Sequence, residues 1–279
     1  MEEVVGWFAA GGRDLPWRGT RDPWAVLVSE LMLQQTGVAR VLPRYVAFLE
    51  RFGTPAACAA APVGDTVALW QGLGYNRRAV NLHRCAVAIT TAHGGQLPTT
   101  LDGLLGLPGI GPYTARAVLA FAYEQPVGVL DVNVQRALSR LHGRPVTQPD
   151  ADALAAHAAA LPGGAWAWNQ AVMELGATVC RPRPRCAECP AMTRCAWREA
   201  GPIEPDPWVR ARPQSRFEGS DRQGRGRLVD ALRSGPVAEP DLPEVMGWPD
   251  DPERSTRVAA TLEADGLATH AEDGTWHLP

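Results

Sequence analysis

A tight glycine turn constrains the fold of this 279-residue chain more than any other stretch. Leu107-Pro108-Gly109-Ile110-Gly111 separates an apolar run at 101–107 from a helix-like run at 112–123, which begins with proline. Proline suits the first position of a helix, and Gly109 and Gly111 are expected to let a backbone with positive φ approach another surface. Free N–H groups at such a turn bind anions, most often phosphate.

An aspartate follows the hairpin at the start of another helix. Asp131 lies between a β-branched and apolar run and an amphipathic stretch containing Val134, Leu138 and Leu141. This spacing predicts that Asp131 is the N-cap of that helix. A helical hairpin with a capping aspartate would by itself account for both features.

A single carboxylate interrupts an apolar helix near the N-terminus. Asp22-Pro23-Trp24 opens the helix, which reads WAVLVSELMLQQT and contains Glu30. A carboxylate among apolar residues is costly unless it is paired, protonated or used in chemistry. Glu30 is therefore either salt-bridged to an arginine or a general acid with a raised pKa.

Four cysteines near residue 190 form the strongest local motif. Cys180, Cys186, Cys189 and Cys195 follow the spacing C-x5-C-x2-C-x5-C. Four thiols this close suit a tetrathiolate zinc site or an iron–sulfur cluster, and the spacing does not choose between them. Arginines interleave with the cysteines and would either neutralise DNA phosphates or offset the charge of a cluster. These arginines are Arg181, Arg183, Arg185, Arg194 and Arg198. Cys58 and Cys85 stand apart and are expected to be buried small apolar residues.

The composition excludes one kind of chemistry. All 27 basic residues are arginines, so no lysine amine is present to form a Schiff base with a sugar aldehyde. The net charge is −3, so any basic surface must be local. No apolar run is long enough to span a membrane, and the acidic N-terminus lacks the features of a signal peptide. These features predict a cytoplasmic protein with no membrane partner.

Periodicity predicts a helical protein with a separate C-terminal unit. Helices are expected over 1–12, 23–36, 37–51, 63–71, 76–92, 112–123, 134–142, 150–161 and 167–178. A Pro-, Arg- and Ser-rich linker is expected over 201–221. The tail, residues 222–279, is expected to hold helices over 223–233, 240–246 and 251–265, with 266–269 pairing with 275–278. Three helices and a hairpin suggest a winged helix, which would be either a DNA contact or a packing appendage.

Taken together, these motifs resemble one family. SELMLQQT, LPW, QGLGY, LPGIGPYT, VLDVNVQR, MELGATVC and the four cysteines occur in the order found in MutY-type adenine glycosylases of the helix-hairpin-helix, glycine-proline-aspartate (HhH-GPD, endonuclease III-like) superfamily. The resemblance covers roughly residues 14–200 and implies an all-α, two-lobed fold. One lobe would comprise 1–22 and 129–200 with the cysteine loop, and the other 23–128 with the hairpin. The linker and the winged-helix-like tail would follow.

The resemblance also implies an activity. A monofunctional enzyme of base excision repair would flip adenine out of double-stranded DNA, where it is mispaired with 8-oxoguanine or guanine, and hydrolyse its glycosidic bond. Lyase relatives carry a lysine just after the hairpin, where this chain has Tyr113. A bacterial, nucleoid-associated monomer is implied.

The family's functional residues map onto this chain position by position. Glu30 resembles the general acid and Asp131 the group beside the anomeric carbon, with Tyr113 and Asn133 as the other catalytic positions. Residues of the adenine pocket would be Trp17, Arg18, Leu33, Tyr113 and Glu174, and residues meeting the opposite base would be Gln35, Thr36, Leu73 and Tyr75. Gly109 and Gly111 would hold a DNA phosphate, and Cys180, Cys186, Cys189 and Cys195 would hold a [4Fe–4S] cluster.

Two departures leave alternatives open. The first two cysteines are separated by five residues rather than the family's usual six, which leaves the metal open between iron and zinc. The tail is too short for the Nudix-like domain of many relatives, as in the shorter form seen in some high-GC bacteria, which leaves the opposite-base preference open. A T·G or U·G mismatch glycosylase of the same fold remains a rival, as does a non-catalytic damage-binding protein. A pure binder, however, gains nothing from two desolvated carboxylates.

Overall fold

The computed structural model describes residues 1–201, 205–209 and 216–279. Most of the predicted linker falls within this description, while its segments 202–204 and 210–215 lie outside it. Contacts divide the chain into two compact units, which are described separately. The first comprises Met1–Leu27, Thr99–Leu105 and Ile110–Arg212, and the second comprises Val28–Pro98, Gly106–Gly109 and Pro213–Pro279.

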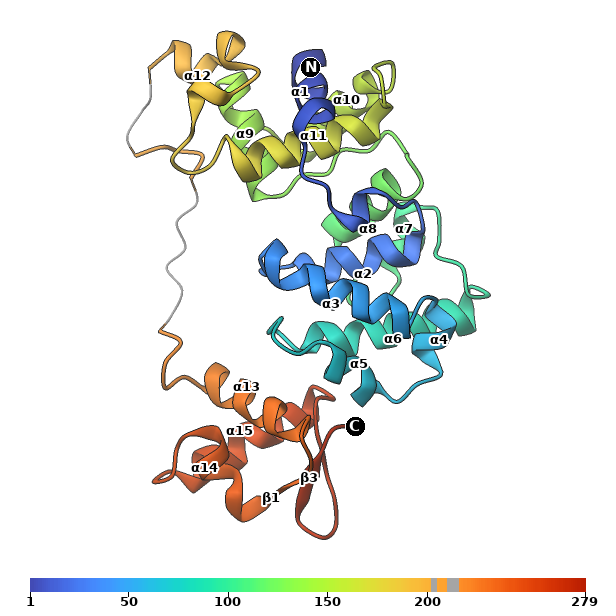
Figure 1. The fold of residues 1–279 in the computed structure, drawn as a ribbon, viewed down its shortest axis with the longest axis vertical. Helices are drawn as coiled ribbons and strands as arrows, with labels where there is room; N and C mark the ends of the chain where they lie inside the picture. The colour runs from blue at the N-terminus through green and yellow to red at the C-terminus, as the bar shows by residue number, and fades with distance from the viewer. Residues whose placement is uncertain (202–204, 210–215) are drawn as a thin grey trace. The chain divides into compact units, whose positions relative to one another are not determined.

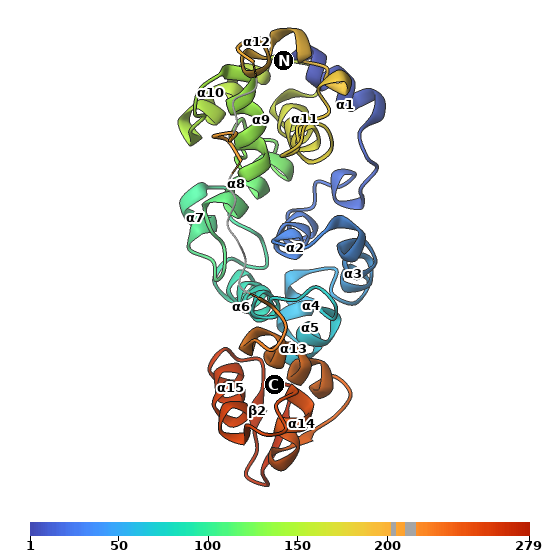
Figure 2. The same ribbon diagram turned by 90° about the vertical axis from the view of Figure 1, so that its left-hand side faces the viewer.

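The first unit is helical and packs around helix α11. Its helices are α1 Glu2–Gly11, α7 Leu101–Leu105, α8 Pro112–Phe121, α9 Val132–His142, α10 Gln148–Ala158, α11 Gly164–Thr178 and α12 Ala196–Glu199. Short 3-10 helices cover Pro16–Arg18, Cys186–Glu188 and Met192–Arg194. Val172 and Leu175 of α11 belong to one buried apolar cluster with Val4 of α1 and Leu138 of α9. Helices α1, α9 and α11 lie side by side in both views (Figures 1 and 2). This apolar burial holds together segments that lie far apart in the sequence.

Helix α2, Pro23–Leu33, crosses from the residues of the first unit to those of the second. The rest of the second unit's helical core is α3 Val38–Arg51, α4 Pro55–Ala59, α5 Val63–Leu69 and α6 Arg77–Ala92. An aromatic cluster anchors it, because Phe48 meets Phe52 and Trp70 edge-on at 5.3 and 6.5 Å between ring centroids. Edge-on packing of this kind is the favoured geometry for buried rings.

The tail belongs to the second unit and contains the expected three helices, α13 Asp221–Leu232, α14 Leu242–Met246 and α15 Pro252–Ala264. A 3-10 turn covers Glu239–Asp241. Strands β1 Val237–Ala238, β2 Thr269–His270 and β3 Thr275–His277 form an antiparallel sheet in the order β1-β3-β2 (Figure 1). The predicted hairpin is confirmed, with Thr269 paired to His277 and His270 to Trp276.

Specific hydrogen bonds fix the tail to the helices of its unit. The guanidinium of Arg233, at the end of α13, donates to the carbonyl of Val67 at 3.0 Å. The N–H of Gly64 donates to the carbonyl of Pro279 at 2.6 Å, and a Cβ at Gly64 would lie 2.4 Å from that oxygen. Packing is therefore one role of the tail.

The helix predictions are confirmed within a few residues at each end. Helices α4, α7 and α12 and strand β1 are not among the expected elements, because none is long enough to show an apolar period. No helix of the described residues is long and apolar enough to cross a membrane.

Candidate active site and metal centre

Asp131 occupies the N-cap of α9, as its position in the sequence predicts. Its Oδ1 accepts hydrogen bonds from the backbone N–H groups of Asn133 at 2.8 Å and Val134 at 2.7 Å. Its Oδ2 accepts from the side-chain amide of Asn133 at 3.2 Å. These hydrogen bonds hold the carboxylate in one fixed orientation at the start of α9.

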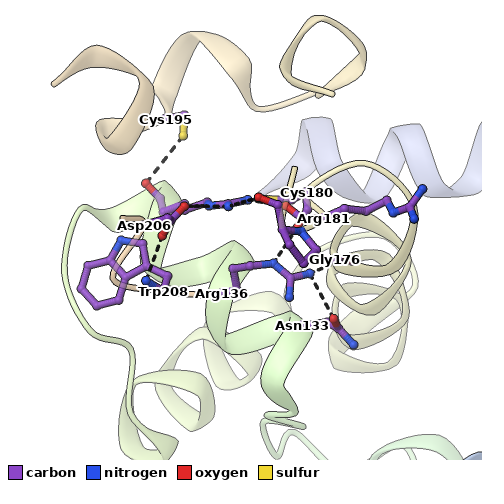
Figure 3. A network of polar contacts seen from close by, with 10 residues as sticks. Asn133, Arg136, Gly176, Cys180, Arg181, Cys195, Asp206 and Trp208 are labelled. Carbon is purple, nitrogen blue, oxygen red and sulfur yellow. Dashed lines mark hydrogen bonds and ion pairs between the residues drawn. The ribbon is translucent and has the colours of Figure 1, made fainter. Parts of the chain in front are cut away.

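A polar network joins Asn133, which contacts this carboxylate, to the cysteine loop (Figure 3). The guanidinium of Arg136 donates to the side-chain oxygen of Asn133 at 3.0 Å. It also donates to the carbonyls of Gly176 at 2.9 Å and Cys180 at 3.0 Å. Gly176 brings α11 close enough for this network, because a Cβ there would lie 2.8 Å from the carbonyl oxygen of Asn133. Arg136 was not identified from the sequence.

Glu174, on α11, is held by two arginines. Arg13 donates to its two carboxylate oxygens at 2.7 and 2.8 Å, and Arg18 donates to Oε2 at 2.7 Å. Burial raises the pKa of Glu174, but hydrogen bonds from Arg13 and Arg18 outweigh burial and leave it below its ordinary value. Arg18 also donates to Gln170 at 2.9 Å. The structure thus brings together two predicted pocket residues, Arg18 and Glu174, as an ion pair.

Glu30 lies in the middle of α2 and is 5% exposed. Its neighbours in the helix, Val28 and Leu31, are 1% exposed or less. The structure therefore places the Glu30 carboxyl group inside the protein and not on its surface.

The predicted site residues fall in both units. The first unit contains Trp17, which is 7% exposed, and Tyr113 near the start of α8. Its other predicted site residues are Arg18, Gly111, Asp131, Asn133, Glu174 and the four cysteines. The second unit contains Glu30, Leu33, Gln35, Thr36, Leu73, Tyr75 and Gly109.

Arg78 organises the second unit's predicted residues and was missed by sequence reasoning. Its guanidinium donates to the carbonyls of Leu31 at 2.6 Å, Gln34 at 2.6 Å and Gly74 at 2.9 Å, and to the hydroxyl of Thr36 at 3.0 Å. Burial lowers the pKa of Arg78 to about 10, so the group stays charged at neutral pH. One side chain therefore ties the end of the Glu30 helix to the turn that precedes α6. The sequence signal was only a basic residue just after QGLGY.

The positive φ expected at both hairpin glycines is confirmed at Gly109 and wrong at Gly111. Gly109 has φ +77°, and a Cβ there would lie 2.7 Å from the Cβ of Asn81, so both conformation and space require glycine. Gly111 has φ −98° and ψ 175°, and a Cβ there would meet nothing within 4 Å. It is the N-cap of α8 in extended backbone, which other residues also adopt.

The four cysteines line one cavity of about 20 Å³. Within the described residues, no three His, Cys, Asp or Glu side chains are close enough to hold one metal ion. As a donor set, however, four thiols around a common cavity fit the thiolate ligation of zinc or of an iron–sulfur cluster.

Arg140, on α9, is hydrogen-bonded to this loop. Its guanidinium donates to the sulfur of Cys180 at 3.4 Å and to the carbonyls of Arg181 at 2.7 Å and Pro182 at 3.0 Å. It also donates to Oδ2 of Asp206 at 2.7 and 2.9 Å. With its side chain only 1% exposed, Arg140 fixes the loop from inside.

Residues 28–161 match the model of the HhH-GPD superfamily base excision DNA repair proteins. The chain is 45% identical over 286 residues to the adenine DNA glycosylase of Mycolicibacterium smegmatis, covering 99% of this chain and 94% of that protein. It is 38% identical over 216 residues to the adenine DNA glycosylase of Homo sapiens, covering 70% of this chain and 39% of that protein. The mycobacterial match includes the tail.

Two solved structures resemble the fold. A thermostable thymine-DNA glycosylase aligns with a TM-score of 0.65 and 27% identity, covering 71% of this chain and 94% of its own. A trapped endonuclease III–DNA covalent intermediate aligns with a TM-score of 0.59 and 22% identity, covering 71% of this chain and 93% of its own. The helical architecture is common to both.

Proposed function

This chain belongs to the adenine DNA glycosylase family of the HhH-GPD superfamily, and we propose that it removes adenine mispaired with 8-oxoguanine or guanine in double-stranded DNA. It is a glycosylase of base excision repair, and we take it to act as a monomer. The observation that carries the proposal is the fixed Asp131 carboxylate, whose Oδ1 accepts two backbone hydrogen bonds.

The chemistry divides between two carboxyl groups. Glu30 would donate a proton to the adenine ring, which makes the base a better leaving group. As the bond from the base to the sugar breaks, positive charge develops on the sugar, and the ionised Asp131 would stabilise it. Water then completes the hydrolysis at the anomeric carbon. Glu30 is buried and Asp131 is held by backbone hydrogen bonds, which support a fixed position for each group.

The remaining residues would bind and position the DNA. Asn133 would orient Asp131, and Tyr113, with Trp17, Arg18, Leu33 and Glu174, would surround the extruded adenine. Gln35, Thr36, Leu73 and Tyr75 would meet the opposite base, and an intercalating Tyr75 would offset part of the cost of extrusion. The N–H groups of the hairpin at Gly109 and Gly111 would hold a phosphate of the backbone.

The cysteine loop would hold a [4Fe–4S] cluster through Cys180, Cys186, Cys189 and Cys195. Their shared cavity supports this assignment, with zinc as the alternative. When bound, the cluster would cross-link the loop and hold its arginines in place. Iron and acid-labile sulfide counted per chain would separate the two metals.

The enzyme would hydrolyse the glycosidic bond and would not cut the strand, because strand cleavage by the lyase route depends on a lysine. No lysine is present, and Tyr113 stands at the position of the lyase lysine. A Schiff base with the sugar aldehyde requires an amine.

The decisive experiment is a single-turnover excision assay on duplexes containing A·8-oxoguanine, A·G, T·G or U·G. Wild-type protein is expected to release adenine, while Glu30→Gln and Asp131→Asn lose release without losing duplex binding. Glu50→Gln, which removes an exposed carboxylate on α3, is the matched control and should behave as wild type. Release of thymine or uracil instead would indicate the mismatch rival, and binding with no release would indicate a damage-binding protein.

A further inference from the structure

The tail and the helical core of the second unit together enclose a cavity of about 360 Å³. This volume lies within the range of about 300–1,000 Å³ typical of ligand sites. One wall comes from the loop after α2 and the start of α6, with Gln34, Gln35, Tyr75, Asn76, Arg77, Arg78 and Asn81. The other comes from the tail, with Arg222, Arg225, Gly226, Leu262 and Leu267. The cavity is thus completed by a segment that the family's site residues do not include.

The walls of this cavity are cationic. Arg222 and Arg225 of α13 and Arg77 and Arg78 of α6 all line it, and the lining contains no acidic residue. One carboxylate lies nearby: Asp265 is 2.5 Å from Arg225 and 3.5 Å from Arg77. A concave surface with several positive charges focuses an attractive field on an anion.

The core side of the cavity carries two strained residues. Gln35 has φ 55° and Tyr75 has φ 48°, and only Glu124 among the other described non-glycine residues shares this conformation. Tyr75 is also 44% exposed, which is unusual for a large aromatic residue. Backbone strain and an exposed ring mark functional positions, and an exposed ring is a platform for a nucleobase.

We propose that α13 completes the DNA-binding surface of this enzyme, with Arg222 and Arg225 binding phosphates of the strand that carries the base opposite the adenine. The identification of that strand rests on the proposed function, which assigns Gln35 and Tyr75 to the opposite base. Guanidinium groups, side-chain amides and one exposed aromatic ring are the chemistry that binds a nucleic-acid strand. The tail is therefore both a packing element, through Arg233 and Gly64, and a DNA contact.

Arg222 is the residue to vary first. Arg225 also bonds Thr261 and Asp265 inside the tail, so its removal would affect packing. Arg222 lies over the ring of Phe217 at 5.3 Å, near the start of α13. Arg222→Ala is the main variant, and Arg222→Lys keeps the charge. Arg257→Ala removes an arginine of the tail that is 63% exposed and outside the cavity, so it is the matched control.

The measurement is duplex binding by full-length protein as a function of salt, with a 2′-fluorinated adenosine opposite 8-oxoguanine to prevent excision. Arg222→Ala is expected to weaken binding about tenfold and to make the slope of log K against log salt shallower by about 0.9, the value for one phosphate contact. Arg222→Lys should retain most of the affinity and slope. Arg257→Ala should leave the affinity, the slope and the excision of the unmodified duplex as in wild type, because Arg257 lies outside the cavity.

The outcomes separate this surface from the proposed activity. If wild type excises adenine but Arg222→Ala binds DNA with unchanged affinity and slope, the proposed DNA contact of α13 is wrong and the proposed activity stands. The cavity would then be a site for a protein partner. Equal losses of duplex affinity in Arg222→Ala and Arg257→Ala would also overturn the proposed surface, because the net charge of the tail alone would then explain the binding. If wild type excises no adenine and Arg222→Ala still weakens binding selectively, the surface stands as a DNA contact and the activity fails.

Discussion

The guanidinium of Arg18 lies 2.7 Å from the carboxylate of Glu174, although 156 residues separate them in the sequence. Their side chains are 10% and 3% exposed. Burying two charged groups has a large desolvation free energy. Removing one partner therefore leaves the other as an uncompensated buried charge, which destabilises the fold. The segment before α2 and helix α11 therefore depend on each other.

Glu174→Gln is expected to lower the free energy of unfolding by about 3 kcal/mol at pH 7, because Arg13 and Arg18 lose their counter-charge. The folded pKa of Glu174 is below its ordinary value of 4.5, so its stabilising effect is present above pH 4.5 and is lost as pH falls below it. Urea titrations between pH 7 and pH 3 would show this loss in wild type. The prediction would be contradicted if the unfolding free energy of Glu174→Gln fell as steeply between pH 7 and pH 3 as that of wild type.

Arg78→Lys is expected to destabilise the protein by about 2–3 kcal/mol, despite keeping the charge. An ammonium has three donors and no planar fork, so buried carbonyls now bonded to Arg78 would lose their partners. Arg40→Lys, on the exposed surface of α3, should change stability by less than about 0.5 kcal/mol. Thermal and urea unfolding would compare the two, and equal stabilities would refute the role given to Arg78.

Gly109→Ala and Gly111→Ala are expected to differ although the residues are two apart. Alanine at 109 meets both a positive φ and the side chain of Asn81, which should cost about 2 kcal/mol of stability and weaken DNA binding. Alanine at 111 has allowed backbone angles and open space, so stability should stay within about 0.5 kcal/mol. Unfolding free energies and duplex affinity of both variants test this, and similar losses would argue against the assigned geometry.

Cys58 and Cys85 are expected to resist alkylation in the folded protein. Burial raises the pKa of Cys58 from 9.0 to about 11 and that of Cys85 to about 12. Only the thiolate reacts, so at pH 8 a shift of this size lowers its population about 100-fold at Cys58. Mass spectrometry after iodoacetamide treatment would measure modification, with the urea-unfolded chain as control. Labelling of either residue at the rate seen in urea would show that the core opens.

Local signals predicted the helices and some of the site. Asp131 was assigned as an N-cap because capping depends only on neighbours in the chain. The turn sequence likewise predicts a positive φ and a close backbone contact at Gly109. It predicts the same for Gly111, because only the backbone angles distinguish the two glycines. Short elements such as α4 carry too few residues for a periodic pattern.

Long-range partners could not be predicted. Arg78 donates hydrogen bonds to carbonyls more than forty residues earlier in the chain. The sequence around Arg78 does not show which carbonyls it will contact. Arg136 reaches Cys180 across 44 positions. The tail's strand β1 forms only by pairing with β3, so its existence depends on the folded tail. In each case the contact depends on the tertiary packing of segments that are distant in the sequence.

The hydrogen bonds of Arg140 bear on how the cysteine loop binds its metal group. Its contacts to Arg181, Pro182 and Asp206 shape the cysteine loop through the polypeptide alone. The metal group proposed for the four cysteines would then bind a loop that α9 already holds in place, so less ordering entropy would be lost on binding.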